Sequence, residues 1–64
     1  MPNKVKERRQ ELGKTQDWLA LQAGVSRITI SEIENNKTKP RAELALRISK
    51  ALGRLCEELF SPGM

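Results

Sequence analysis

The side chains best suited to bind a ligand lie in two neighbouring stretches, residues 26–32 and residues 35–41. The second stretch, NNKTKPR, has three basic side chains and no acidic one, so its formal charge is +3. Residues 1–14 also carry +3, from five basic and two acidic side chains, whereas residues 15–34 between them carry −2. Basic segments on both sides of one structural unit suit an anionic partner such as nucleic acid.

The sequence offers little for catalysis. It has no histidine and one cysteine, and it shows no nucleophile–base spacing, no glycine-rich phosphate loop and no cluster of metal ligands. The serines Ser26, Ser31, Ser49 and Ser61 occupy positions typical of helix caps or helix surfaces. We therefore predict that the protein is not an enzyme and needs no metal or other cofactor.

Residues 16–34 have room for two short helices and a tight corner. Leu19, Ala20 and Ala23 form an apolar stripe on the first helix, and Ile30 and Ile33 form one on the second. A small residue such as Ala20 lets two helices that are joined by a short turn cross closely.

The corner itself is Gly24-Val25-Ser26. Glycine enters the left-handed conformation that ends a helix without a Cβ clash. Val25 can fill the gap between the helices, and the Ser26 hydroxyl can cap the next helix by accepting a backbone N–H. These residues predict a helical hairpin.

Eight positions in this hairpin form a pattern that is more specific than any one of them: Gln16, Ala20, Gly24, Val25, Ser26, Ile30, Ile33 and Glu34. The set resembles the helix-turn-helix of the phage repressor and Cro family, also called the xenobiotic-response-element family, of bacterial DNA-binding proteins. The resemblance covers about residues 4–60. It implies that the second helix enters the major groove of double-stranded DNA while the first lies across the backbone. The alternative is an ordinary helical hairpin in a small bundle.

Within this resemblance, four side chains of the second helix are predicted to contact bases. Arg27 can bond guanine O6 and N7, Ile28 can meet a thymine methyl, and Glu32 can accept from cytosine N4. Thr29 suits either a base or a phosphate. Ile28 is the most informative, because a β-branched apolar side chain on a solvent face gains nothing unless that face meets a partner. For Arg27 the alternative is a solvated side chain that pairs with Glu32 or another neighbour.

A further eight side chains are predicted to contact phosphates, which fix the register of a protein on DNA. They are Gln16 and Ser26 in the hairpin, and Asn35, Asn36, Lys37, Thr38, Lys39 and Arg41 after it. For the last six the alternative is a solvated loop. The resemblance also implies an ion pair between Arg9 and Glu34, which we interpret as structural because a desolvated pair fixes geometry more than it adds stability.

Proteins of this kind usually bind inverted repeats as twofold dimers, with half-sites about 10 bp apart. We therefore predict a repressor-like transcriptional regulator that acts as a homodimer on operator DNA. The neutral C-terminal third, around Arg54, Leu55 and Glu58, is the surface most available for dimerisation. The chain has no room for an effector domain, so no small-molecule effector site is expected.

The predicted fold is all-α, a compact five-helix bundle that forms one domain over residues 1–64, with 61–64 as a tail. Helices are expected at 3–12, 16–23, 27–34, from Pro40 or Arg41 to 52, and at 55–60. Asn3 and Thr15 are the expected N-caps, and Asn36 is expected to take the left-handed conformation.

Three further groups of side chains are expected to complete the core. They are Val5 and Leu12 in the first helix, Ala42, Leu44, Ala45, Leu46, Ile48, Ser49, Ala51 and Leu52 in the fourth, and Cys56, Leu59 and Phe60 in the last.

One cysteine excludes a disulfide within the chain, and no apolar run approaches the ~18 residues of a membrane span. These features predict a cytoplasmic protein without a membrane partner.

The competing function is a protein-interaction module, such as the antitoxin of a toxin–antitoxin pair or a restriction–modification controller. Trp18 and Leu21 share one side of the first hairpin helix and are the candidate patch for a protein partner. We favour the simpler interpretation that the indole folds over the edge of the N-terminal helix.

Overall fold

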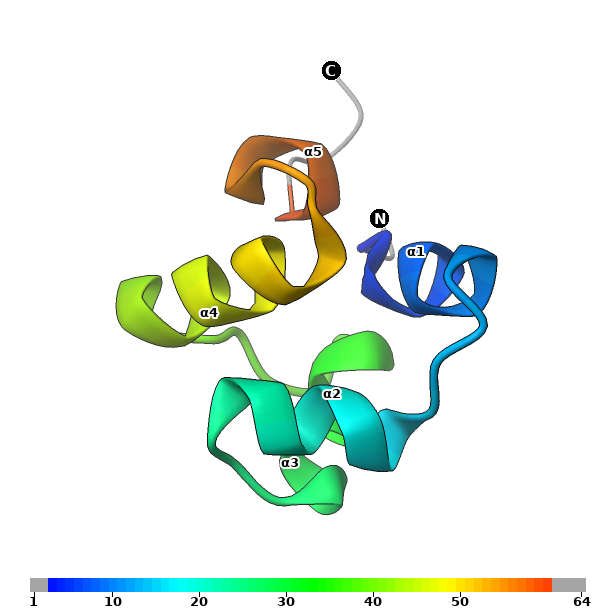
Figure 1. The fold of residues 1–64 in the computed structure, drawn as a ribbon. Coiled ribbons are helices and arrows are strands. Elements are labelled where there is room, and N and C mark those ends of the chain that lie inside the picture. The colour runs from blue at the N-terminus through cyan, green and yellow to red at the C-terminus, as the bar shows by residue number, and fades with distance from the viewer. Residues whose placement is uncertain (1–2, 61–64) are drawn as a thin grey trace.

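Five α-helices build the computed structural model, which describes residues 3–60 (Figure 1). They are α1 (Val5–Glu11), α2 (Gln16–Ala23), α3 (Arg27–Glu34), α4 (Ala42–Leu52) and α5 (Cys56–Phe60). Residues 3–60 contain no strand, so the predicted all-α five-helix class is confirmed. The predicted tail at 61–64 lies outside the described residues.

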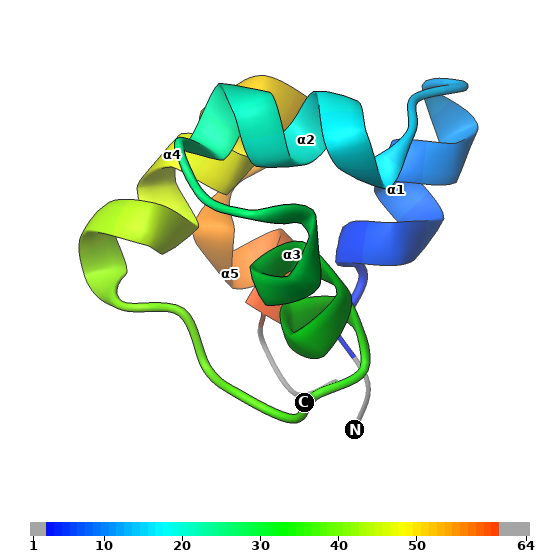
Figure 2. The same ribbon diagram turned by 90° about the horizontal axis from the view of Figure 1, so that it is seen from below.

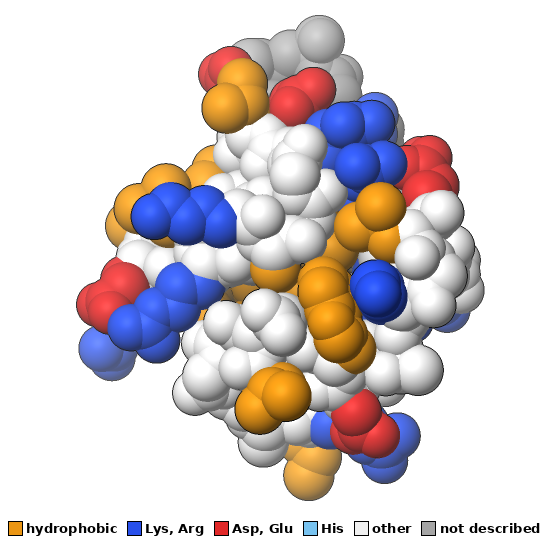
Figure 3. Space-filling view, viewed as in Figure 1, with side chains coloured by type: hydrophobic (Ala, Val, Ile, Leu, Met, Phe, Trp, Pro, Cys, Tyr) orange, Lys and Arg blue, Asp and Glu red, His pale blue; other side chains and the backbone are white. Residues whose placement is uncertain are grey.

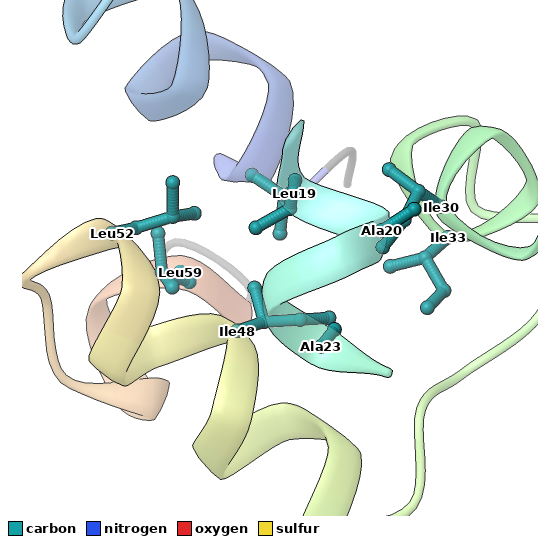
Figure 4. Close-up of a cluster of buried hydrophobic side chains, with 9 residues drawn as sticks. Leu19, Ala20, Ala23, Ile30, Ile33, Ile48, Leu52 and Leu59 are labelled. Carbon is teal, nitrogen blue, oxygen red and sulfur yellow. The ribbon is translucent and has the colours of Figure 1, made fainter. Parts of the chain in front are cut away.

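The core forms where α2 meets its neighbours. Apolar side chains from four helices converge there in Figure 4, and each is at most 5% exposed: Leu19, Ala20 and Ala23 of α2, Ile30 and Ile33 of α3, Ile48 and Leu52 of α4, and Leu59 of α5. Val5 of α1 completes the cluster at 0% exposure. Burial of this apolar surface is the main favourable term in folding.

The corner between α2 and α3 has the predicted geometry. Gly24 ends α2 in the left-handed conformation with φ 72°, and the Val25 amide donates to the Ala20 carbonyl. Val25 is partly buried against the core. Ser26 then caps α3 by accepting from the Thr29 amide, as Thr15 caps α2 by accepting from the Trp18 amide. The corner thus fixes how α3 leaves α2.

Asn36 ends α3 as glycine ends three of the other helices. Its φ of 58° is left-handed, and the following Lys37 amide donates to the Glu32 carbonyl at 2.9 Å. The same backbone bond closes α1 after Gly13, α2 after Gly24 and α4 after Gly53. The φ of Asn36 confirms its prediction. Asparagine tolerates this conformation better than most residues.

Helix α3 and helix α5 occupy opposite ends of the molecule. In Figure 1, α5 lies at the top, and α2 and α3 lie at the bottom. Seen from below in Figure 2, α3 faces the viewer, and the segment after it runs along the outside of the molecule to α4. One side of α3 is therefore free of other helices.

Helix α1 differs from its prediction at both ends. It begins at Val5 with Lys4 as its N-cap residue, so the prediction that Asn3 is the N-cap is wrong. Asn3 lies two residues before the helix, and its Oδ1 accepts from the Val5 amide. Leu12 follows the helix and is 38% exposed, so the prediction that it points inward is wrong. Arg8 extends along the bundle instead, and its Nε donates to the Leu52 carbonyl at 2.8 Å. A cation at the carbonyl end of α4 stabilises that end.

The outer parts of the last two helices are also less buried than predicted. Helix α4 begins at Ala42 after Arg41, and Ala42 and Leu46 are exposed rather than in the core. Helix α5 begins at Cys56, which is half-buried with its thiol 3.4 Å from the Ser49 hydroxyl. Within residues 3–60, no neighbouring helix covers Ala42 and Leu46.

We expect Gly24→Ala to lower the free energy of unfolding by about 1–2 kcal/mol, because an L-residue is strained in the left-handed conformation. Chemical denaturation of both proteins measures the loss. Gly13→Ala is the matched comparison and should lose a similar amount, because Gly13 has φ 70° and a Cβ there would meet nothing within 4 Å, so its loss measures the strain of this conformation alone. Equal stability of Gly24→Ala and the parent would contradict this account of the corner.

Candidate nucleic-acid interface

Three of the four predicted base-contacting side chains are exposed on the outer face of α3. Arg27, Ile28 and Glu32 are exposed, and Ile28 has 68% of its surface in solvent. Ile30 and Ile33, on the inner face of the same helix, are completely buried. Helix α3 thus has one apolar face in the core and an opposite face, with Ile28, in solvent.

These side chains border a shallow hollow of about 310 Å³, which we call the α3 hollow. Its lining comes from the start of α2, from α3 and from the following turn: Gln16, Arg27, Ile28, Ser31, Glu32 and Lys37. The structure thus brings together three predicted base contacts and two predicted phosphate contacts.

Thr29 and Ser26 lie outside this hollow and bind each other. Their hydroxyl oxygens are 3.1 Å apart, and Ser26 Oγ also accepts from the Thr29 amide at 3.2 Å. Thr29 is half-buried, whereas Ser26 is exposed. The main local role of Ser26 is therefore that of a helix cap.

The predicted phosphate cluster of residues 35–41 is divided. The Asn35 side-chain nitrogen Nδ2 donates to the Ser31 carbonyl, and Lys37 borders the α3 hollow. Thr38 and Lys39 border a second cavity of about 390 Å³, which we call the side cavity. It is lined by Asn3, Asn36, Thr38, Lys39, Pro40, Ala45, Cys56 and Phe60. Arg41 precedes α4, is exposed and borders neither space.

A buried ion pair lies behind α3. Arg9 Nε is 2.8 Å from Glu34 Oε2, and Arg9 Nη2 is 3.2 Å from Glu34 Oε1. The third guanidinium nitrogen, Nη1, donates to the Lys14 carbonyl. Gln16 Nε2 donates to Glu34 Oε1 at 3.0 Å, so α1, α2 and α3 all meet at one carboxylate.

Two residues of this surface were not predicted from the sequence to belong to it. Ser31 lines the α3 hollow one turn after Ile28, so helical spacing alone would have found it. Asp17 Oδ1 lies 3.7 Å from Arg27 Nε. Nothing in the sequence pairs these two residues, because their contact arises only when the starts of α2 and α3 come together.

Trp18 and Leu21 differ in exposure. Trp18 is half-buried against the core, with Lys14 Nζ 5.2 Å from its ring centre, whereas Leu21 is 78% exposed. Apolar side chains reach the surface where α1 and α2 meet in Figure 3. Leu21 is thus the main apolar group that α2 offers to a partner.

Residues 3–60 contain no group of three or more histidine, cysteine or acidic side chains that could hold a metal ion. Among the described helices, none is long and apolar enough to cross a membrane.

The arrangement of the helices matches a solved repressor. The P22 c2 repressor, in a crystal structure with synthetic operator 9T, superimposes with a TM-score of 0.86 and 35% sequence identity. The match covers 89% of this chain and 86% of that chain. The class of fold is therefore the repressor-type DNA-binding domain.

The sequence relationships agree with this class. A family model described as Helix-turn-helix matches residues 5–59. An uncharacterized HTH-type transcriptional regulator of Methanothermobacter thermautotrophicus is 48% identical over 50 residues, which cover 78% of this chain and 72% of the relative. The uncharacterized HTH-type transcriptional regulator YgzD of Bacillus subtilis is 42% identical over 60 residues, which cover 94% and 91%. The chain belongs to the helix-turn-helix family, as the sequence predicted, and with it to the sequence-specific DNA-binding regulators.

We expect Arg9→Met to unfold the protein or to lower its melting temperature sharply. Removing one partner of a buried pair costs about 3–5 kcal/mol, and a domain of this size has roughly that much net stability. Replacing both partners, Arg9→Met with Glu34→Leu, should recover most of the loss, because no charge is left buried alone. Circular dichroism melts of the single and double variants measure this. A double variant no more stable than Arg9→Met would contradict it.

Proposed function

We propose that the protein is a transcriptional regulator that binds an inverted-repeat operator as a homodimer, with α3 in the major groove. The observation that carries this proposal is the α3 hollow, where exposed Ile28 lies among Arg27, Glu32, Gln16 and Lys37. A face with apolar, donor and acceptor side chains offers each kind of contact used to read base edges in the major groove. The P22 c2 repressor, which shares the fold, was solved in complex with a synthetic operator, and this supports operator DNA as the partner.

The side chains divide by role. Arg27, Ile28 and Glu32 read base edges, Ser31 joins them at the same face, and Thr29 contacts a base or a phosphate at the edge of that face. In the free protein, Asp17 holds the exposed Arg27 only weakly, because surface ion pairs contribute about 0–1 kcal/mol. Arg27 is therefore free to exchange Asp17 for guanine.

The proposed contacts to the DNA backbone lie around this face of α3. Gln16 and Lys37 border the hollow directly, while Ser26, Asn35, Asn36, Thr38, Lys39 and Arg41 approach phosphates on either side of α3. With about four to six phosphates neutralised per subunit, log K should fall with log salt at a slope of roughly −4 to −5.

We expect Arg27→Ala to weaken binding to the preferred operator by about 1–3 kcal/mol and to relax selectivity at one base position. Lys37→Ala should weaken binding to all sequences and reduce the salt slope by about 1. Fluorescence anisotropy titrations at several salt concentrations separate the two effects. Lys6→Ala is the control of equal charge, because Lys6 is exposed on α1 outside both sets of predicted contacts. Equal losses for Lys6→Ala and Lys37→Ala would overturn the assignment.

Dimerisation is the part of the proposal that needs a second surface. The region around Arg54, Leu55 and Glu58 has an open groove of about 680 Å³ between α4 and α5, with Leu46 53% exposed and Leu55 62% exposed. Helix α5, which lines one side of this groove, lies at the end of the molecule away from α3 (Figure 1). A twofold dimer that reads one face of DNA needs both α3 helices on the same side. The groove is thus poorly placed for that purpose.

The side cavity is better placed. It is lined by the turn that follows α3 and by Cys56 and Phe60 of α5, so it runs from the proposed DNA face along the flank of the molecule. Two copies that meet at this flank can present both α3 helices to one DNA face, in successive turns of the major groove. We therefore propose that the dimer contact lies on the Ala45, Cys56 and Phe60 side of this cavity, while Asn36, Thr38 and Lys39 on its other side keep their phosphate contacts.

We expect Ala45→Lys, in the side cavity, to prevent dimer formation on operator DNA, whereas Leu55→Lys, in the groove, leaves it intact. A lysine at a closely packed contact between copies would bring like charges together across the twofold axis. Sedimentation of each variant with operator DNA gives the number of subunits bound, and circular dichroism checks that both fold. Loss of the dimer with Leu55→Lys alone would move the contact to the groove.

A protein-interaction module, such as an antitoxin or a restriction–modification controller, remains the second candidate. The exposed Leu21 favours it, although Trp18 packs inward and leaves that patch small. Leu21→Lys distinguishes the two, because it should leave DNA binding unchanged and abolish only partner binding.

A further inference from the structure

We infer that Glu34 acts as a positioning residue for Gln16: it turns the Gln16 side chain so that the amino group, and not the carbonyl oxygen, faces the DNA. The Arg9–Glu34 pair would then set the phosphate contact of α2 as well as the packing of α1. This inference rests on the proposed function, because it concerns the phosphate contact of Gln16.

The Glu34 carboxylate is surrounded by hydrogen-bond donors. Its side chain is 1% exposed, and its oxygens accept from Arg9 Nε at 2.8 Å, Arg9 Nη2 at 3.2 Å and Gln16 Nε2 at 3.0 Å. An ionised carboxylate accepts hydrogen bonds and cannot donate them. The atom of Gln16 that faces Glu34 must therefore be its nitrogen.

The bond to Glu34 decides which groups of the Gln16 amide remain on its outer side. A glutamine amide has one acceptor oxygen and an NH₂ group with two N–H donors. One N–H is used by Glu34, so the other is available on the same side of the amide, at the border of the α3 hollow beside Lys37. A phosphate oxygen is an acceptor and suits this N–H. The reversed amide would turn its oxygen toward both anions.

The charge of Glu34 is neutralised by Arg9. Glu34 would repel a nearby phosphate if its charge stood alone, but Arg9 bonds both of its oxygens. The pair has no net charge, so Glu34 orients Gln16 without adding a negative charge to the DNA face. The contribution of Gln16 to DNA affinity should therefore depend on Glu34, which makes the effects of changing the two residues non-additive.

The orientation is tested first in the free protein by NMR of the side-chain amide protons. Gln16 should show one amide proton that is shifted and exchanges more slowly than those of Gln22, an exposed glutamine on the same helix. In Glu34→Gln this difference should shrink, because the buried acceptor is no longer an anion. Gln16 signals indistinguishable from those of Gln22 in the parent protein would overturn the inference, and this comparison needs no variant.

The consequence is tested with DNA, using Gln16→Met, Glu34→Gln and the double variant. Gln16→Met should weaken operator binding about tenfold or more, since it removes a hydrogen bond to a charged group. Glu34→Gln, measured at a temperature at which circular dichroism shows it and the double variant to be folded, should lose most of the same factor, and the double variant should be no weaker than Gln16→Met. Additive losses would overturn the positioning role.

The matched control is Gln22→Met, which should bind like the parent. A methylphosphonate in place of the phosphate that contacts Gln16 should remove the effect of Gln16→Met. If NMR finds the amide fixed but Gln16→Met binds like the parent, the phosphate contact of the proposed function fails while the orientation stands. If Arg27→Ala also leaves specific binding unchanged, the proposed function itself fails.

Discussion

The structure depends on one buried carboxylate. Glu34 ends the helix that faces solvent, and its oxygens accept from Arg9 of α1 and from Gln16 at the start of α2. Burial of apolar side chains drives the collapse of such a small domain, but it is not directional. A carboxylate with three fixed donors is directional, and an uncompensated charge at this position would cost about as much as the whole domain has in net stability. The angle at which α3 presents its outer face is therefore set by a polar contact within an apolar bundle.

The corner between α2 and α3 supplies the other half of this geometry. Gly24 turns the chain, Val25 packs against the core and Ser26 starts α3, so the inner isoleucines are buried and the outer face stays free. Ile28 on that face gains nothing from folding. Under the proposed function a DNA groove, which offers thymine methyls together with hydrogen-bonding edges, covers it. The family and the fold point to the same class of partner.

Most of the fold follows from local chemistry that a sequence displays. The stop at Gly24, the caps at Thr15 and Ser26 and the left-handed Asn36 each involve residues a few positions apart, and all were predicted correctly. The errors in burial lie at Leu12, Ala42 and Leu46, where helical spacing predicts an apolar position but none of the described helices covers it. The site shows the same division. Residues of one helix face could be chosen from spacing, whereas the Asp17–Arg27 contact, the Gln16–Glu34 bond and the separation of Lys37 from Lys39 depend on how the helices meet.

Selection of binding sites from randomised duplex DNA, at moderate salt and with competitor DNA, tests the central claim most directly. A dimer that reads bases through α3 should recover a short inverted repeat whose half-sites lie about 10 bp apart, centre to centre. Base preferences at the positions nearest Arg27, Ile28 and Glu32 should then change when those residues are replaced. Recovery of no motif, with binding that depends only on salt, would contradict the claim that the exposed face of α3 reads DNA sequence.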